Sequence, residues 1–142
     1  IRIQILKMKK LLVLLIGLTL ISCNSADDSL DDYQEAMPIE SVTLPQEFIV
    51  NEEYDITLTY LRPTTCHAFN NILLQKHDNE RNFYVIGTVF QSNGNCTELN
   101  AELEASFNFN PTIAGSYIFK FWQGEDDNGE DIYLTEEITV VE

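Results

Sequence analysis

Several segments of this chain alternate apolar and polar residues with a period of two, the pattern of a strand with one buried face. The alternation is clearest over residues 54–60 and recurs over residues 103–109 and 117–122. Short apolar runs between turn residues predict further strands at residues 39–44, 48–50, 69–76, 82–90 and 132–141. Residues 82–90 are apolar on both faces, so this strand is expected to lie inside a sheet. The pattern predicts an all-β protein.

Two places fit the strand pattern less well. Leu99, Leu103 and Phe107 recur at every fourth position, which also fits a helical turn over residues 97–105. Phe109 fits the strand phase better, so a strand is favoured there. Glu136 falls in phase with the apolar residues of the last strand. Because a lone buried carboxylate is costly, Glu136 is expected at a sheet edge or at a bulge that re-aims it.

Residues 38–142 are enough for one sandwich-sized core, and about seven strands at regular spacing predict an Ig-like antiparallel β-sandwich. The segment Gly115-Ser116-Tyr117-Ile118-Phe119 supports this architecture. It resembles the G-x-Y-x-F start of the penultimate strand in many extracellular Ig-like modules. That resemblance implies a tight turn at Gly115 and a Tyr117 hydroxyl bonded to the backbone.

The N-terminus reads as a signal peptide over residues 1–22. Leu11–Ile21 is an apolar run preceded by Lys7, Lys9 and Lys10. The run is too short to span a bilayer but suits the core of a signal peptide. A buried helix is the alternative, which the lack of a polar face disfavours. The natural start is expected at Met8, with residues 1–7 upstream of it.

The end of this run, Leu20-Ile21-Ser22-Cys23, resembles the lipobox of bacterial lipoproteins. The resemblance implies diacylglyceryl attachment to the sulfur of Cys23, cleavage before Cys23 and acylation of the new N-terminus. Several acyl chains on one residue give a lasting anchor, whereas a single chain binds reversibly. The expected partner of Cys23 is therefore a lipid bilayer, and the expected location is the outer membrane.

Residues 23–37 are expected to form a disordered acidic tether, since they carry five acids and no basic residue. An acidic stretch behind the lipidated cysteine resembles the export signal on surface lipoproteins of the Bacteroidetes. That resemblance implies display on the cell surface, with an inward-facing outer-membrane lipoprotein as the alternative. Asp28-Ser29-Leu30 also resembles the O-glycosylation acceptor of that phylum, which would place a glycan on Ser29.

The charge balance excludes one class of partner. After Cys23, four basic residues stand against 23 acidic residues. A domain this acidic repels phosphate backbones, so nucleic-acid binding is excluded.

Cys66 and Cys96 remain once Cys23 is assigned to the lipid. An even pair in an exported chain predicts a disulfide, here between two loops at one end of the sandwich. A zinc site that adds His67 and His77 is the alternative. The adjacency of Cys66 and His67 is poor for tetrahedral binding, so both histidines are expected to be ordinary loop and turn residues.

Residues 125–131 place five carboxylates in one short loop, and calcium favours several oxygen ligands on such a loop. Asp126, Asp127 and Asp131 are the candidate ligands. The EF-hand register is not met, and Asn128-Gly129 is a strong hairpin signal. A solvated hairpin tip without a metal is the favoured interpretation.

No Ser/His/Asp or Cys/His arrangement remains after the cysteines are paired, so neither catalysis nor a cofactor is expected. The favoured function is a non-catalytic binding or structural module on a lipid tether. One alternative is an accessory glycan-binding subunit of an envelope complex, for which Trp122 is the residue of interest. Another follows from residues 62–66, where Pro63-Thr64-Thr65 resembles the first inhibitory loop of chagasin-like cysteine protease inhibitors. Arg62 and Cys66 depart from that loop's pattern.

Overall fold

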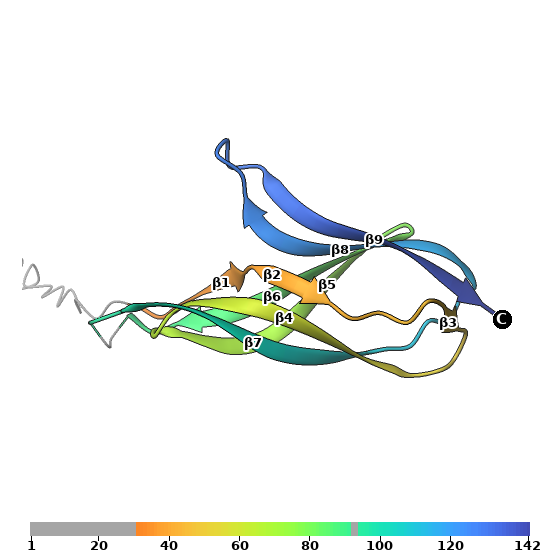
Figure 1. Cartoon of the computed structure of the whole chain (residues 1–142), viewed down its shortest axis with the longest axis horizontal. Helices are drawn as coiled ribbons and strands as arrows, with labels where there is room; N and C mark the ends of the chain where they lie inside the picture. Colours follow the sequence, from red (N-terminus) through yellow and green to blue (C-terminus); the bar gives the residue numbers. More distant parts are fainter. Residues whose placement is uncertain (1–30, 92–93) are drawn as a thin grey trace, which may run out of the picture.

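The structure is a computed structural model that describes residues 31–91 and 94–142, and these residues form an all-β sandwich of two sheets (Figure 1). The strands are β1 (Tyr33–Met37), β2 (Ile39–Val42), β3 (Phe48–Ile49), β4 (Tyr54–Thr64), β5 (His67–His77), β6 (Glu80–Val89), β7 (Glu98–Phe109), β8 (Gly115–Glu125) and β9 (Asp131–Val141). Across these residues, no helix has the length and apolar character needed to cross a membrane. The all-β sandwich prediction is confirmed.

The smaller sheet has the order β2-β4-β7, and the larger sheet is built around β6. One side of β6 pairs with β5 along its whole length. The other side pairs with β1 at residues 85–89 and with β8 at residues 80–83. The larger sheet then continues through β9 to the short strand β3. As predicted from its apolar faces, the strand that begins at Glu80 lies inside its sheet.

Two strand pairs are parallel, β6 with β8 and β3 with β9. The prediction of an antiparallel sandwich is therefore wrong for these two pairs. Between β6 and β8 the connecting chain passes through the smaller sheet. β7 crosses to pair with β4, so β8 returns beside β6 running in the same direction.

The sandwich begins before Pro38, where the sequence places its start. Residues 33–37, assigned to the disordered tether, form β1 and pair in register with β6 from Tyr33↔Val89 to Met37↔Val85. Gly87 lies against this strand. A Cβ built there would lie 2.9 Å from Sδ of Met37, so a larger residue would require the Met37 side chain to shift. The tether prediction is thus wrong for these five residues.

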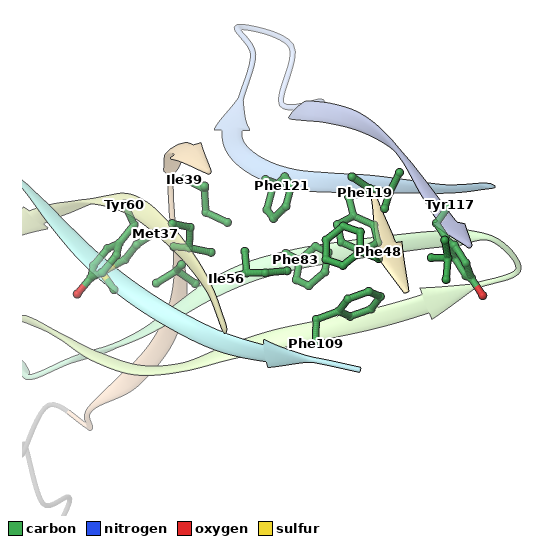
Figure 2. Close-up of a cluster of buried hydrophobic side chains, with 14 residues drawn as sticks. Met37, Ile39, Phe48, Ile56, Tyr60, Phe83, Phe109, Tyr117, Phe119 and Phe121 are labelled. Carbon is green, nitrogen blue, oxygen red and sulfur yellow. The ribbon is translucent and has the colours of Figure 1, made fainter. Parts of the chain in front are cut away.

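The core consists of side chains on the inner faces of both sheets. Phe48, Phe83, Phe119 and Phe121 are fully buried there, and Figure 2 shows them gathered in one cluster. The rings of Phe83 and Phe121 stack with centroids 4.8 Å apart, and Phe83 lies 5.0 Å from Phe119. Burial of such large aromatic surfaces dominates the stability of a domain of this size.

The structure also decides three local predictions made from the sequence. The Tyr117 hydroxyl donates a hydrogen bond to the carbonyl of Ile113 at 2.9 Å, which confirms the predicted corner. Residues 98–109 are strand β7 rather than a helical turn.

Glu136 lies opposite Phe119 yet is exposed, and the only register shift of β8 and β9 lies between Trp122 and Gly124. Glu136 therefore lies at a sheet edge, as one of the two predicted alternatives had it. Strand β3 pairs only with the last two residues of β9, so among the described residues β9 has no neighbour on that side at Glu136.

Candidate functional site

Three aromatic side chains lie across the outer face of the larger sheet. Side chains alternate between the faces of a strand, so Phe83 and Phe121 point into the core while Tyr84 and Trp122 point outward. Tyr133 on β9 is the register partner of Trp122. We call Tyr84, Trp122 and Tyr133 the aromatic row. All three are half-buried.

The aromatic row is held by hydrogen bonds among its own polar atoms. The hydroxyls of Tyr84 and Tyr133 are 2.8 Å apart. Asp131 accepts from Trp122 Nε1 at 2.8 Å through Oδ1, and from the Tyr133 hydroxyl at 3.2 Å through Oδ2. The ring centroids of Tyr84 and Trp122 are 6.5 Å apart, and those of Tyr84 and Tyr133 are 6.2 Å apart. One carboxylate therefore fixes two of the three rings.

The environment of the row changes the acidity of one hydroxyl. Burial raises the pKa of Tyr133, and the hydrogen bond and proximity to Tyr84 raise it further, together with the Asp131 carboxylate. A phenolate at this position would lose its solvation and face the negative charge of Asp131. The Tyr133 hydroxyl therefore stays protonated and keeps its hydrogen bonds above the ordinary titration range of tyrosine.

A shallow depression of about 310 Å³ lies beside the aromatic row on the same face. Its lining includes Leu73, the register partner of Tyr84, and Ile86, two residues farther along β6. Gln34, Glu35 and Asn71 add polar residues to the same lining. The row and the depression together form a mostly apolar surface with a few polar groups, as is typical of small-ligand sites.

This surface has the chemistry that a sugar needs. The C–H face of a pyranose packs on an aromatic ring, and its hydroxyls exchange hydrogen bonds with amides such as those of Gln34 and Asn71. Because the polar atoms of Trp122 and Tyr133 are already bonded to Asp131, a ligand would meet rings whose orientation is set. Such preorganisation lowers the entropy lost on binding.

The acidic loop after Trp122 is the tip of the β8–β9 hairpin, which projects away from the sandwich (Figure 1). Asp126 Oδ1 accepts from the backbone amides of Asn128 and Glu130, at 2.8 and 3.0 Å. These bonds lower the pKa of Asp126. Gly129 takes a positive φ of 79° and its amide donates to the carbonyl of Asp126, so the turn is a three-residue loop closed by a glycine bulge rather than a two-residue Asn-Gly turn.

Two of the three candidate calcium ligands, Asp126 and Asp131, are engaged within the hairpin. Asp126 holds the turn, and both carboxylate oxygens of Asp131 hold the aromatic row. Within residues 31–91 and 94–142, no group of three or more His, Cys, Asp or Glu side chains is placed to hold a metal ion. The acidic loop thus serves the hairpin and the row beside it.

Cys66 and Cys96 form a disulfide with a Cα–Cα distance of 5.3 Å. The bond ties the start of β5 to the chain that leads into β7. The alternative zinc site therefore lacks free thiolates, and its two histidines lie at opposite ends of β5. His77 is exposed next to Asp78.

His67 is not the ordinary loop residue that the sequence suggests. It lies in β5, is 5% exposed, and uses both ring nitrogens. Nδ1 is 2.8 Å from Oγ1 of Thr64, and Nε2 is 2.5 Å from Oε1 of Glu35. Since a carboxylate only accepts, Nε2 carries the proton that faces Glu35. This chain of bonds fixes β1 to the sandwich beside the disulfide.

A hydroxyl, an imidazole and a carboxylate in line resemble a catalytic arrangement in outline. Here, however, the hydroxyl of Thr64 also accepts from the backbone amide of Cys66 at 3.2 Å. Of the three residues, only Glu35 lines the depression beside the aromatic row; Thr64 and His67 do not. Sequence reasoning missed this cluster because Glu35 and His67 are 32 residues apart, and only the unexpected strand β1 brings them together.

The Pro63-Thr64-Thr65 segment does not project as an inhibitory loop would. Pro63 and Thr64 belong to β4 and are half-buried, and the turn is confined to Thr65 and Cys66. Thr65 is bonded to Thr97 through both its amide and its hydroxyl. The predicted lipidation site Cys23 and the predicted glycosylation site Ser29 lie outside the described residues.

Comparisons with known proteins add no relative: no family model matches the chain, and no match was found among curated proteins or solved structures.

Proposed function

We propose that this protein is a non-enzymatic, lipid-anchored glycan-binding module. Cys23 is the point of attachment to the outer membrane, and the acidic segment behind it carries the sandwich to the cell surface. The aromatic row and the adjoining depression are the binding surface. The glycan is an envelope or environmental polysaccharide, or part of a complex in which this chain is an accessory subunit.

The aromatic row carries the proposal. Sandwich strands on a solvent-facing side ordinarily present polar residues, yet Tyr84, Trp122 and Tyr133 lie together on this face. Their polar atoms are bonded to one another and to Asp131. Neighbouring amides of Gln34 and Asn71 can exchange hydrogen bonds with sugar hydroxyls.

The lipid anchor rests on the match of residues 20–23 to the lipobox and on the basic and apolar stretch before it. Only a cysteine sulfur can form the thioether. Cys23→Ser is therefore expected to remain a precursor that incorporates no labelled palmitate in the producing bacterium. Labelling of the Cys23→Ser protein would contradict the anchor without touching the glycan proposal.

Glycan binding is tested through the fluorescence of Trp122, the only tryptophan of the chain. The full chain in detergent is titrated with a panel of soluble oligosaccharides that includes β-glucan, xylan, mannan and α-glucan fragments. A saturable change with at least one of them is expected. Tyr84→Ala should weaken that binding at least tenfold, because one ring face of the row is lost.

The matched control is Ile132→Ala. Ile132 is 43% exposed and lies on β9 next to Tyr133, so its side chain belongs to the opposite face of the hairpin. This variant should bind within twofold of the unaltered chain. Equal losses in both variants, or no response to any oligosaccharide, would refute the glycan proposal.

A further inference from the structure

The basic residues of the described chain are distributed unevenly. After Cys23 the sequence holds only four, Arg62, Lys76, Arg81 and Lys120, against 23 acidic residues. Two of the four, Lys76 and Arg81, line one cavity of about 180 Å³. No Asp or Glu lines it. In a domain so rich in carboxylates, a cavity with two cations and no acid is a marked departure from composition.

The other two basic residues are engaged elsewhere. Lys120 donates to Oε1 of Glu80 at 2.9 Å on the outer face of the larger sheet. Arg62 donates to the carbonyl of Thr65 at 3.0 Å. Lys76 has no carboxylate within ion-pair distance among residues 31–91 and 94–142. Its charge is therefore available to a ligand.

Arg81 is held in place at the cavity. Its Nη1 donates to the carbonyls of Asp78 and Glu80 at 2.9 and 2.8 Å. Its guanidinium lies over the ring of Tyr117, 4.9 Å from the centroid. Tyr117 is fixed in turn by its hydrogen bond to Ile113. The remaining nitrogens of a guanidinium fixed in this way form a rigid fork that suits an oxyanion.

The rest of the lining adds neutral polar groups. Asn108, Asn110 and Thr112 are neutral polar residues of the lining, from the end of β7 and the loop after it. A volume of about 180 Å³ equals roughly six water molecules at about 30 Å³ each. The cavity can therefore take a carboxylate or sulfate group with part of the molecule that carries it.

We propose that this cavity is an anion-binding site for a small oxyanion group, with Lys76 and Arg81 as its charged ligands. The group is the carboxylate of an organic acid or acidic sugar, or a sulfate ester. The site is separate from the aromatic row, with which it shares no residue. It does not depend on the glycan proposal.

The test uses the full chain, labelled with nitrogen-15 and kept in detergent. The Nε–H signal of Arg81, assigned by its absence in Arg81→Lys, is followed during titration with sodium acetate, sodium glucuronate and sodium sulfate. Sodium chloride at the same ionic strength is the reference. A saturable shift with at least one of the three oxyanions, absent with chloride, is expected. The oxyanion that binds most tightly shows whether the natural ligand presents a simple carboxylate, an acidic sugar or a sulfate group.

Two variants that each remove one positive charge distinguish binding at this cavity from a general effect of the net charge. Lys76→Gln, at an exposed residue, should weaken anion binding at least fivefold. Lys120→Gln, which also removes one positive charge but lies on the other face, should leave binding within twofold. Shifts that stay linear and match chloride would overturn the proposal, as would equal losses in both variants. Failure here leaves the glycan titration with Trp122 unaffected, so the two proposals fail separately.

Discussion

The inner and outer faces of β6 and β8 are both aromatic but differ in chemistry. Phe83, Phe119 and Phe121 on the inner face are fully buried and carry no polar atom. Tyr84 and Trp122 on the outer face are half-buried, and each has a polar atom with a partner. In the same two strands, aromatic residues at alternating positions therefore either fill the core or form a hydrogen-bonded row on the outer face. At these positions the inner face packs rings without polar atoms, and the outer face presents rings whose polar atoms are hydrogen-bonded.

The largest effect is expected from Phe119→Ala on the inner face. Removal of a fully buried ring should lower the free energy of unfolding by about 3 to 5 kcal/mol, through lost transfer energy and a residual cavity. Guanidinium denaturation followed by circular dichroism measures the loss. Trp122→Ala on the outer face should cost markedly less. Equal costs for the two variants would show that both faces contribute to the core.

The disulfide tests whether stability and the binding face are independent. Replacing Cys66 and Cys96 together with serine removes a link across 30 residues, which the chain-entropy model values at roughly 3 to 4 kcal/mol. The outer face should keep its oligosaccharide response while the denaturation midpoint falls. In a Cys23→Ser background, thiol titration of the unreduced, denatured chain should find no free thiol. Two free thiols would contradict the bond.

Asp131→Ala should have a smaller effect, confined to the outer face. It removes acceptors from Trp122 and Tyr133, at about 0.5 to 1.5 kcal/mol for each hydrogen bond. The emission of Trp122 should shift, and oligosaccharide binding should weaken because the rings lose their fixed orientation. Asp127→Ala in the same hairpin is the control, with no expected shift. An unchanged spectrum in Asp131→Ala would contradict its role in the row.

The smallest effect is expected from pH. The pKa of Tyr133 is raised above its ordinary value of 10.0, and burial also raises that of Tyr60. The folded chain therefore keeps protons that the unfolded chain loses above pH 10. This contribution to stability is fully present below pH 10 and is lost as the pH rises through the folded-state values. Absorbance at 295 nm should show tyrosines that ionise late.

Tyr133→Phe provides the matching control for this titration. It should remove one late-ionising tyrosine and leave that of Tyr60, since Tyr60 lies in the core away from the outer face. An alkaline titration identical to that of the unaltered chain would contradict the environment described for Tyr133.

The strands could be predicted from sequence because their signal is local. Period-two alternation placed β4 and β8, and the apolar run of residues 82–90 placed β6 inside a sheet. The corner at Tyr117 was predicted for the same reason, since glycine and tyrosine lie two positions apart. Local patterns carry no information about which strands become neighbours. The parallel pairing of β6 with β8 therefore had no counterpart in the sequence analysis.

The candidate sites were also predictable only where their signal was local in the sequence. Trp122 was singled out as an aromatic residue at a strand end, but its partners Tyr84 and Tyr133 come from two other strands. Strand β1 was missed because Asp31, Asp32 and Glu35 made its segment look like a solvated tether. It pairs with residues 85–89 of β6, about fifty positions away in the sequence. Contacts between distant segments decide both features.

The pairing of β1 along β6 has a mechanical consequence. Tension applied at residue 31 and resisted by a ligand on the aromatic row would enter through β1 and leave through β6, which carries Tyr84. The force would run along two antiparallel strands, so the hydrogen bonds of five residue pairs, Tyr33↔Val89 to Met37↔Val85, would share the load in shear. Strands loaded in shear yield together, whereas strands peeled from one end yield one bond at a time. The pairing geometry of β1 thus favours resistance to a pulling force applied at residue 31.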